Sequence, residues 1–170
     1  MSDEIQVLEQ SPVGKAITVL SNELNSLLST EMAKLQGYTN KISEIATVSK
    51  PTAPLYIRDF ILAYDHASQI LAILTKVDLK AKATVDHAEA IAFLERSTEY
   101  LKKINQKDTV EARKQYVSLD QDVIEARDLK ARAEAVLTLV KNKVSQFRMA
   151  HDDVKKIVYG DNFQTGNEGF

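Results

Sequence analysis

Apolar residues recur at helical spacing along most of the chain, and the residues that interrupt helices lie only toward its two ends. Between residues 55 and 159 there is neither a glycine nor a proline. Because nothing in that stretch obliges the backbone to turn, the pattern predicts long helices whose sides pack together. Helices of ordinary globular proteins average about 11 to 12 residues. The sequence therefore predicts an all-α protein, built as a long-helix bundle or a coiled coil.

The first predicted helix spans residues 14–47 and follows a turn at 11–14. Its apolar positions are Ile17, Leu20, Leu24, Leu27, Leu28, Met32, Leu35, Ile42 and Ile45. Gly37 lies inside this pattern, and since a glycine within a helix costs about 1 kcal/mol relative to alanine, we expect it to kink the helix or to divide it. Pro51 and Pro54 then predict a loop near 48–54, because a residue before proline is disfavoured in the α region.

A second helix is predicted to begin near Leu55 and to continue past residue 77. The apolar pattern weakens around 78–86, so that a new helix capped by Thr84 and one uninterrupted helix both fit the sequence. Tyr56, Phe60 and Tyr64 repeat every four residues. Aromatic rings on one helix side can stack on nucleobases, but this spacing is more typical of a packing ridge.

The last helix is predicted to follow a break near 105–108 and to end at Gly160. Asp108 can accept hydrogen bonds from the next backbone amides, and Glu111 stands at the matching position of a capping box. The sequence thus predicts a single elongated helical domain over 14–160, between a flexible N-terminus (1–13) and a flexible tail (161–170).

Within this last helix a heptad pattern holds from residue 123 to 158, which is typical of a coiled-coil seam. The seam positions are Val123, Ala126, Lys130, Ala133, Leu137, Val140, Val144, Phe147, His151, Val154 and Val158. Lys130 and His151 are the polar exceptions, and such residues often fix register or oligomeric state. A straight helix cannot bury this stripe against itself, so we expect it to pair with the earlier helices, with another copy, or with both. The apolar seam, with Val123, Ala126, Leu137, Val140, Val144, Phe147 and Val154 as its members, predicts a homo-oligomer.

Composition narrows the class of protein. The 170 residues, 44% of them apolar, suffice for one domain with a core, and there is no cysteine for a disulfide or a thiolate zinc site. No apolar run of about 18 residues and no secretory leader stand in the sequence, which predicts a cytoplasmic protein without a membrane partner. If a phage encodes it, that cytoplasm is the host's.

Catalytic motifs are lacking in the sequence. His66, His87 and His151 are scattered, and there is no zinc-binding helix motif, no Glu-x-x-His pair and no glycine-rich phosphate loop. We therefore expect no enzyme activity, no cofactor and no metal ion.

Charge is distributed unevenly, although the net charge is only −2. Residues 127–148 contain two acids and six bases, which are Arg127, Lys130, Arg132, Lys141, Lys143 and Arg148. This cluster is either the solvated outer side of a long helix or a contact for a polyanion.

A short segment also occurs twice, as DLKAKA at 78–83 and as DLKARA at 128–133. The run from Leu129 to Arg132, its near copy at 79–82, and the order of Tyr116, Asp120, Asp122 and the long helix to Phe147 resemble phage recombination mediator proteins of the UvsY type. The resemblance covers roughly residues 70–165.

This resemblance implies a small all-helical oligomer that binds single-stranded DNA and helps to load a RecA-like recombinase in place of a single-strand-binding protein. It implies DNA contacts by Lys80 and Lys82 or by Lys130 and Arg132, to which the charge pattern adds Lys141 and Lys143. Tyr100 and Tyr116 stand close to cations in the sequence and are the candidates for stacking on bases. The alternative is a structural or adaptor coiled-coil protein, such as a phage or bacterial assembly component, that binds only other proteins.

Overall fold

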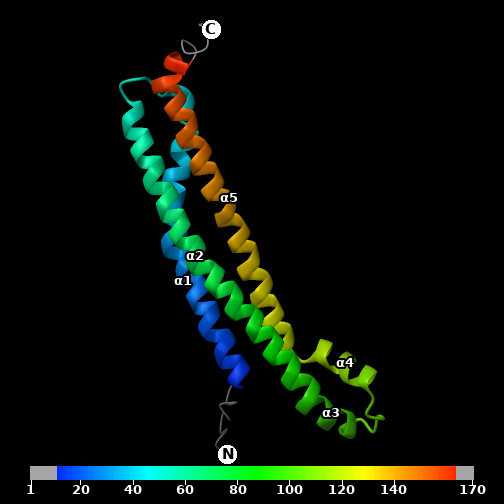
Figure 1. Ribbon diagram of the computed structural model, residues 1–170. Helices are drawn as coiled ribbons and strands as arrows, with labels where there is room; N and C mark the ends of the chain where they lie inside the picture. Colours follow the sequence, from blue (N-terminus) through cyan, green and yellow to red (C-terminus); the bar gives the residue numbers. More distant parts are fainter. Residues whose placement is uncertain (1–10, 164–170) are drawn as a thin grey trace, which may run out of the picture. The chain divides into compact units, whose positions relative to one another are not determined.

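The computed structural model describes residues 11–163, and every regular element in that part of the chain is helical (Figure 1). The elements are α1 (Pro12–Ile42), the 3-10 turn η1 (Ile45–Thr47), α2 (Ala53–Ile91), the π-helical turn η2 (Ala92–Arg96), α3 (Ser97–Lys103), α4 (Val110–Leu119) and α5 (Gln121–Phe163). The prediction of an all-α protein is confirmed.

The described residues group into two compact units, where the sequence predicts one helical domain over 14–160. Unit 1 contains residues 11–24 and 76–134, and unit 2 contains residues 25–75 and 135–163. Each of the three long helices, α1, α2 and α5, therefore contributes one segment to each unit.

The core of each unit is made of apolar side chains from these helix segments, many of them alanines that let helices approach closely. In unit 1 the buried apolar side chains are Val13, Ile17, Leu20, Leu24, Val77, Ala81, Ala88, Ala92, Leu101, Ala112, Val123, Ala126, Leu129 and Ala133. In unit 2 they are Leu35, Ala53, Phe60, Ala63, Ala67, Ile70, Leu74, Leu137, Val140, Phe147, Ala150 and Val154.

The heptad seam of α5 is part of these cores. Val123, Ala126 and Ala133 are buried in unit 1, while Leu137, Val140, Phe147 and Val154 are buried in unit 2, with Val144 half-buried. Phe147 also meets the Tyr38 ring of α1 edge to face, with ring centroids 6.4 Å apart. The chain's own helices thus bury the apolar seam within each unit, so its burial does not require a second copy.

Helix α1 begins two residues earlier than expected, and Gly37 does not divide it. The Gly14 amide donates to Ser11 Oγ over 2.9 Å, so that Ser11 caps the helix. Pro12 takes the first helical position, where its missing amide costs nothing. At the other end α1 stops at Ile42 rather than near residue 47, and η1 follows it.

Helix α2 starts at Ala53, which shortens the predicted loop, and it continues through Thr84 without a break. The Thr84 hydroxyl donates to the Lys80 carbonyl inside the helix and therefore does not cap a new one. The π-helical turn η2, which ends at Arg96, was not expected from the apolar pattern.

The break near 105–108 lies between α3 and α4, but its details differ from the prediction. Thr109 caps α4 by accepting from the Ala112 amide, whereas Asp108 binds the Arg113 guanidinium. The predicted last helix is also two helices, because α4 ends at Leu119 and Asp120 caps α5 by accepting from the Val123 amide at 3.3 Å.

Helix α5 passes through Gly160 and ends at Phe163, so the prediction that Gly160 ends it is wrong. The remainder of the predicted tail, residues 164–170, and residues 1–10 of the predicted N-terminal segment lie outside the described residues.

Candidate nucleic-acid interface

The two short repeats lie in unit 1, and they do not occupy equivalent environments. Leu79 of the first repeat is 62% exposed, whereas its counterpart Leu129 is buried. Lys80 of the first repeat is exposed and lies 3.3 Å from Glu23 Oε2, and Lys82 is exposed without an ion pair to any described residue. The shared leucine therefore does not anchor both repeats in the core.

Lys130 of the second repeat is held by two carboxylates. Its Nζ lies 2.9 Å from Asp78 Oδ1 and 3.0 Å from Glu134 Oε2. The hydrogen bond to Asp78 and then that to Glu134 raise the pKa of Lys130. Asp78 is the first residue of the first repeat, so the two repeats contact each other, and Lys130 is largely neutralised. Arg132, two positions on, is exposed.

Tyr100 and Tyr116, the predicted stacking residues, pack on one another. Their ring centroids are 4.9 Å apart at an interplanar angle of 38°. The Tyr116 hydroxyl donates to Asp120 Oδ2 over 3.1 Å, and burial is the main reason that the pKa of Tyr116 is raised. The neighbouring cation Arg113 binds Asp108 and lies over the Phe93 ring. Neither tyrosine thus presents two free ring faces to a base.

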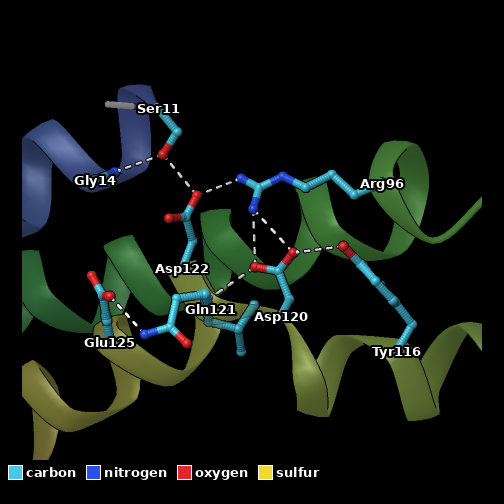
Figure 2. Close-up of polar contacts among 9 residues, drawn as sticks. Ser11, Gly14, Arg96, Tyr116, Asp120, Gln121, Asp122 and Glu125 are labelled. Carbon is cyan, nitrogen blue, oxygen red and sulfur yellow. Dashed lines mark hydrogen bonds and ion pairs between the residues drawn. The ribbon is translucent and has the colours of Figure 1, made fainter. Parts of the chain in front are cut away.

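Asp120 also belongs to a polar cluster, the Arg96 cluster, that joins four elements of unit 1 (Figure 2). Arg96 Nη1 donates to both oxygens of Asp120 at 3.0 Å, and Nη2 donates to Asp122 at 2.6 Å. The Ser11 hydroxyl donates to the same Asp122 oxygen over 2.7 Å. Burial works against the charged form, but the hydrogen bond to Asp122 and the charges of both aspartates raise the pKa of Arg96. With two carboxylates around one guanidinium, the cluster does not suit an anionic ligand and instead ties α1, η2, α4 and α5 together.

The cations of α5 in unit 2, unlike Lys130 and Arg96 in unit 1, include exposed side chains that no carboxylate of the described residues holds. Residues 135–151 of this helix contain three Lys and Arg residues and no acid. Lys141, Arg148 and Lys155 are exposed, and none of them forms an ion pair with a described residue. Since they are seven residues apart, the three lie on one side of the helix about two turns from each other. We call these three residues the α5 cationic face; Asp152, four residues after Arg148, is an acid on the same side of the helix.

Lys143 does not belong to this face. It stands two residues after Lys141, about 200° around the helix, and it is half-buried where it lines a groove with Gln146 and Met149. Of the predicted DNA contacts, the structure therefore leaves Lys82 in unit 1 and Lys141 in unit 2 as exposed cations without an ion pair to a described residue.

Beside the α5 cationic face, side chains of α2 and α5 in unit 2 line an open cavity of about 260 Å³. Its lining residues are Phe60, Ile61, Tyr64, Arg148, His151 and Asp152. Lys155 and this cavity had no part in the sequence-based predictions, and Arg148 entered them only as one of the six bases of residues 127–148. The seven-residue spacing of the cations is a signal in the sequence that could have found the face.

Other polar groups in unit 2 are paired near a larger cavity of about 680 Å³ beside Gly37. His66 Nε2 lies 3.0 Å from Glu31 Oε2, and Lys41 binds Asp59. The hydrogen bond from Lys34 is the main reason that the pKa of Glu31 is lowered. Within residues 11–163 no cluster of three or more acidic or histidine side chains could hold a metal ion, and no helix is long and apolar enough to span a bilayer.

Comparison with protein-family models, with curated proteins and with solved structures finds no match to this chain.

Proposed function

We propose that this helical protein binds single-stranded DNA through its phosphates on the α5 cationic face. The observation that supports this most is the absence of acids from residues 135–151, where Lys141 and Arg148 stand exposed without ion pairs to described residues. Free cations displace counterions from a phosphate chain, whereas cations already held by carboxylates, such as Lys130, gain little from it. The proposed interface thus lies in unit 2 rather than at the two repeats.

Charge reversal tests this interface. We expect the triple variant Lys141→Glu, Arg148→Glu, Lys155→Glu to bind an oligo(dT) at least tenfold more weakly at about 50 mM salt. The slope of log K against log salt should also become shallower by about 2, since each single-strand phosphate contact contributes about 0.7. Fluorescence anisotropy across several salt concentrations measures both quantities.

The matched control is the triple variant Lys103→Glu, Lys107→Glu, Lys114→Glu in unit 1, which changes the net charge equally at exposed lysines without ion pairs to described residues. It should lower affinity far less and leave the slope nearly unchanged. Equal losses in both variants would mean that only overall charge matters, and oligo(dT) binding by the wild type that does not weaken between about 50 and 200 mM salt would contradict a phosphate-dominated mode.

Loading of a RecA-like recombinase in place of a single-strand-binding protein is the finer part of this proposal and is supported only by the UvsY-type resemblance. A ring or chain of copies would repeat the modest α5 cationic face along the strand and strengthen binding by avidity. Such a homo-oligomer would have to use a surface other than the buried seam. Recombinase filament formation on DNA coated with single-strand-binding protein, with and without this chain, tests the loading step.

A scaffold that binds only proteins is the second candidate, and exposed apolar side chains in unit 1 favour it. Leu94, Ile104, Val110 and Leu119 are all exposed on the segment from η2 to α4. Light scattering of the purified protein with and without single-stranded DNA, at two salt concentrations, separates the candidates. A scaffold assembles without responding to DNA, whereas the proposed DNA binder gains mass at low salt and loses it at high salt.

A further inference from the structure

The cavity between α2 and α5 in unit 2 has an apolar interior and a polar rim. Phe60 is fully buried and closes its inner side, and Ile61 and Tyr64 line it from the same helix. Arg148, His151 and Asp152 line it from α5. At about 260 Å³ it is smaller than the roughly 300–1,000 Å³ of sites for drug-sized ligands, so it suits a single flat ring system.

Tyr64 is the tyrosine of this unit best placed to stack on such a ring. It is 39% exposed, and no described residue hydrogen-bonds its hydroxyl. Tyr56, two turns away in the same series, donates to Glu44 over 2.7 Å, and Tyr38 packs against Phe147. The aromatic series of α2, which the sequence favours as a single packing ridge, is therefore not one ridge. Phe60 packs in the core, whereas Tyr64 faces the cavity.

The rim provides polar groups of the kinds that meet a base and its phosphate. Arg148 has no ion pair with a described residue, so its donors are free for a phosphate oxygen. His151 Nδ1 lies 3.1 Å from Asp152 Oδ1, which orients the imidazole. Its Nε2 has no partner among residues 11–163 and can hydrogen-bond the edge of a base.

We propose that this cavity receives one unpaired nucleobase of a single strand, stacked on Tyr64, with Arg148 on the adjoining phosphate. The inference rests on the proposed function, because Arg148 also belongs to the α5 cationic face. A base site of this kind makes the protein prefer single strands over duplexes, since a base that is paired and stacked in a duplex cannot enter the cavity. Stacking of this kind tolerates any base, because every base has a π face.

The test compares oligo(dT) with an abasic oligomer of equal length, which keeps the phosphates and sugars but lacks bases. We expect the wild type to prefer oligo(dT) by about fivefold or more, the lower range for one stacked base. Tyr64→Leu keeps the apolar bulk and removes the ring, so this preference should fall by a similar factor while the salt slope stays the same. Tyr64→Phe should retain the preference.

Tyr100→Leu, at a unit 1 tyrosine that is as exposed as Tyr64 and lies outside the cavity lining, is the matched control and should keep the preference of the wild type. Circular dichroism checks that each variant stays helical. A Tyr64→Leu protein that keeps the full preference overturns the base site and leaves phosphate binding intact. Failure of the wild type to bind either oligomer overturns the proposed function itself.

Discussion

At the scale of single residues, Asp120 is the most deeply buried charged group in the part of the chain that the structure describes. It is 3% exposed at its side chain, yet it accepts from Arg96, Tyr116 and the Val123 amide. Removal of one partner from a buried ion pair leaves the other charge uncompensated. Because Arg96 still reaches solvent and the substitution also removes the cap of α5, we expect Asp120→Ala to lower the free energy of unfolding by about 2 to 4 kcal/mol.

Urea denaturation of Asp120→Ala measures this loss. Asp86→Ala is the control, since Asp86 is exposed and forms no ion pair with a described residue; it should change stability by no more than about 0.5 kcal/mol. If Asp120→Ala were as mild as the control, the Arg96 cluster would not hold α1, η2, α4 and α5 together.

The Arg96 cluster could not be read from the sequence, although Asp120 and Asp122 were noted there. Arg96 reaches Asp120 because η2 and the α4–α5 junction meet in the folded chain. Ser11, which joins the cluster through Asp122, stands 111 positions before that residue in the sequence. The same reason explains why Lys130 was expected to be free for DNA: its partner Asp78 lies on another helix. The residue types were visible, but their partners depend on which helices pack together.

At the scale of helices, α1 makes a direct test possible at Gly37. The helix is continuous there, and a Cβ added to Gly37 meets nothing within 4 Å. Since alanine is favoured over glycine inside a helix and also restricts the unfolded chain, we expect Gly37→Ala to raise the free energy of unfolding by about 0.5 to 1 kcal/mol. Thermal or urea unfolding measures the change.

Gly160→Ala provides the comparison, because its Cβ also finds open space but it lies three residues from the end of α5. A helix end frays, so the gain there should be smaller. A loss of stability in Gly37→Ala would contradict the expected gain and show that α1 needs glycine at this position.

Helix interiors were predictable where helix ends were not. The apolar period is a local property, and it located the buried side of α5, including Val123, Val140 and Phe147. An end depends on which side chain captures the free amides. Asp108 had the right chemistry to cap α4, but Arg113 holds its carboxylate, and Thr109 takes the amide. The cap at Asp120 was missed because the apolar pattern continues through it.

At the scale of the whole molecule, the question is whether the apolar seam of α5 packs against a second copy or against helices of its own chain. Val140 is fully buried within unit 2 by the chain's own helices. We expect Val140→Ala to destabilise the fold by about 1 to 3 kcal/mol through lost packing, and to leave the molecular mass in solution unchanged.

Sedimentation equilibrium and urea unfolding, each over a hundredfold range of protein concentration, check the two halves of this prediction. If the seam joined copies, the substitution would lower the mass at low concentration, and the loss of stability would depend on concentration by mass action. If the seam packs only within its own chain, Val140→Ala lowers the free energy of unfolding equally at every protein concentration. This holds whatever oligomer the protein forms through other surfaces. The α5 cationic face would then remain available on each copy, because the helix that carries it is held from within.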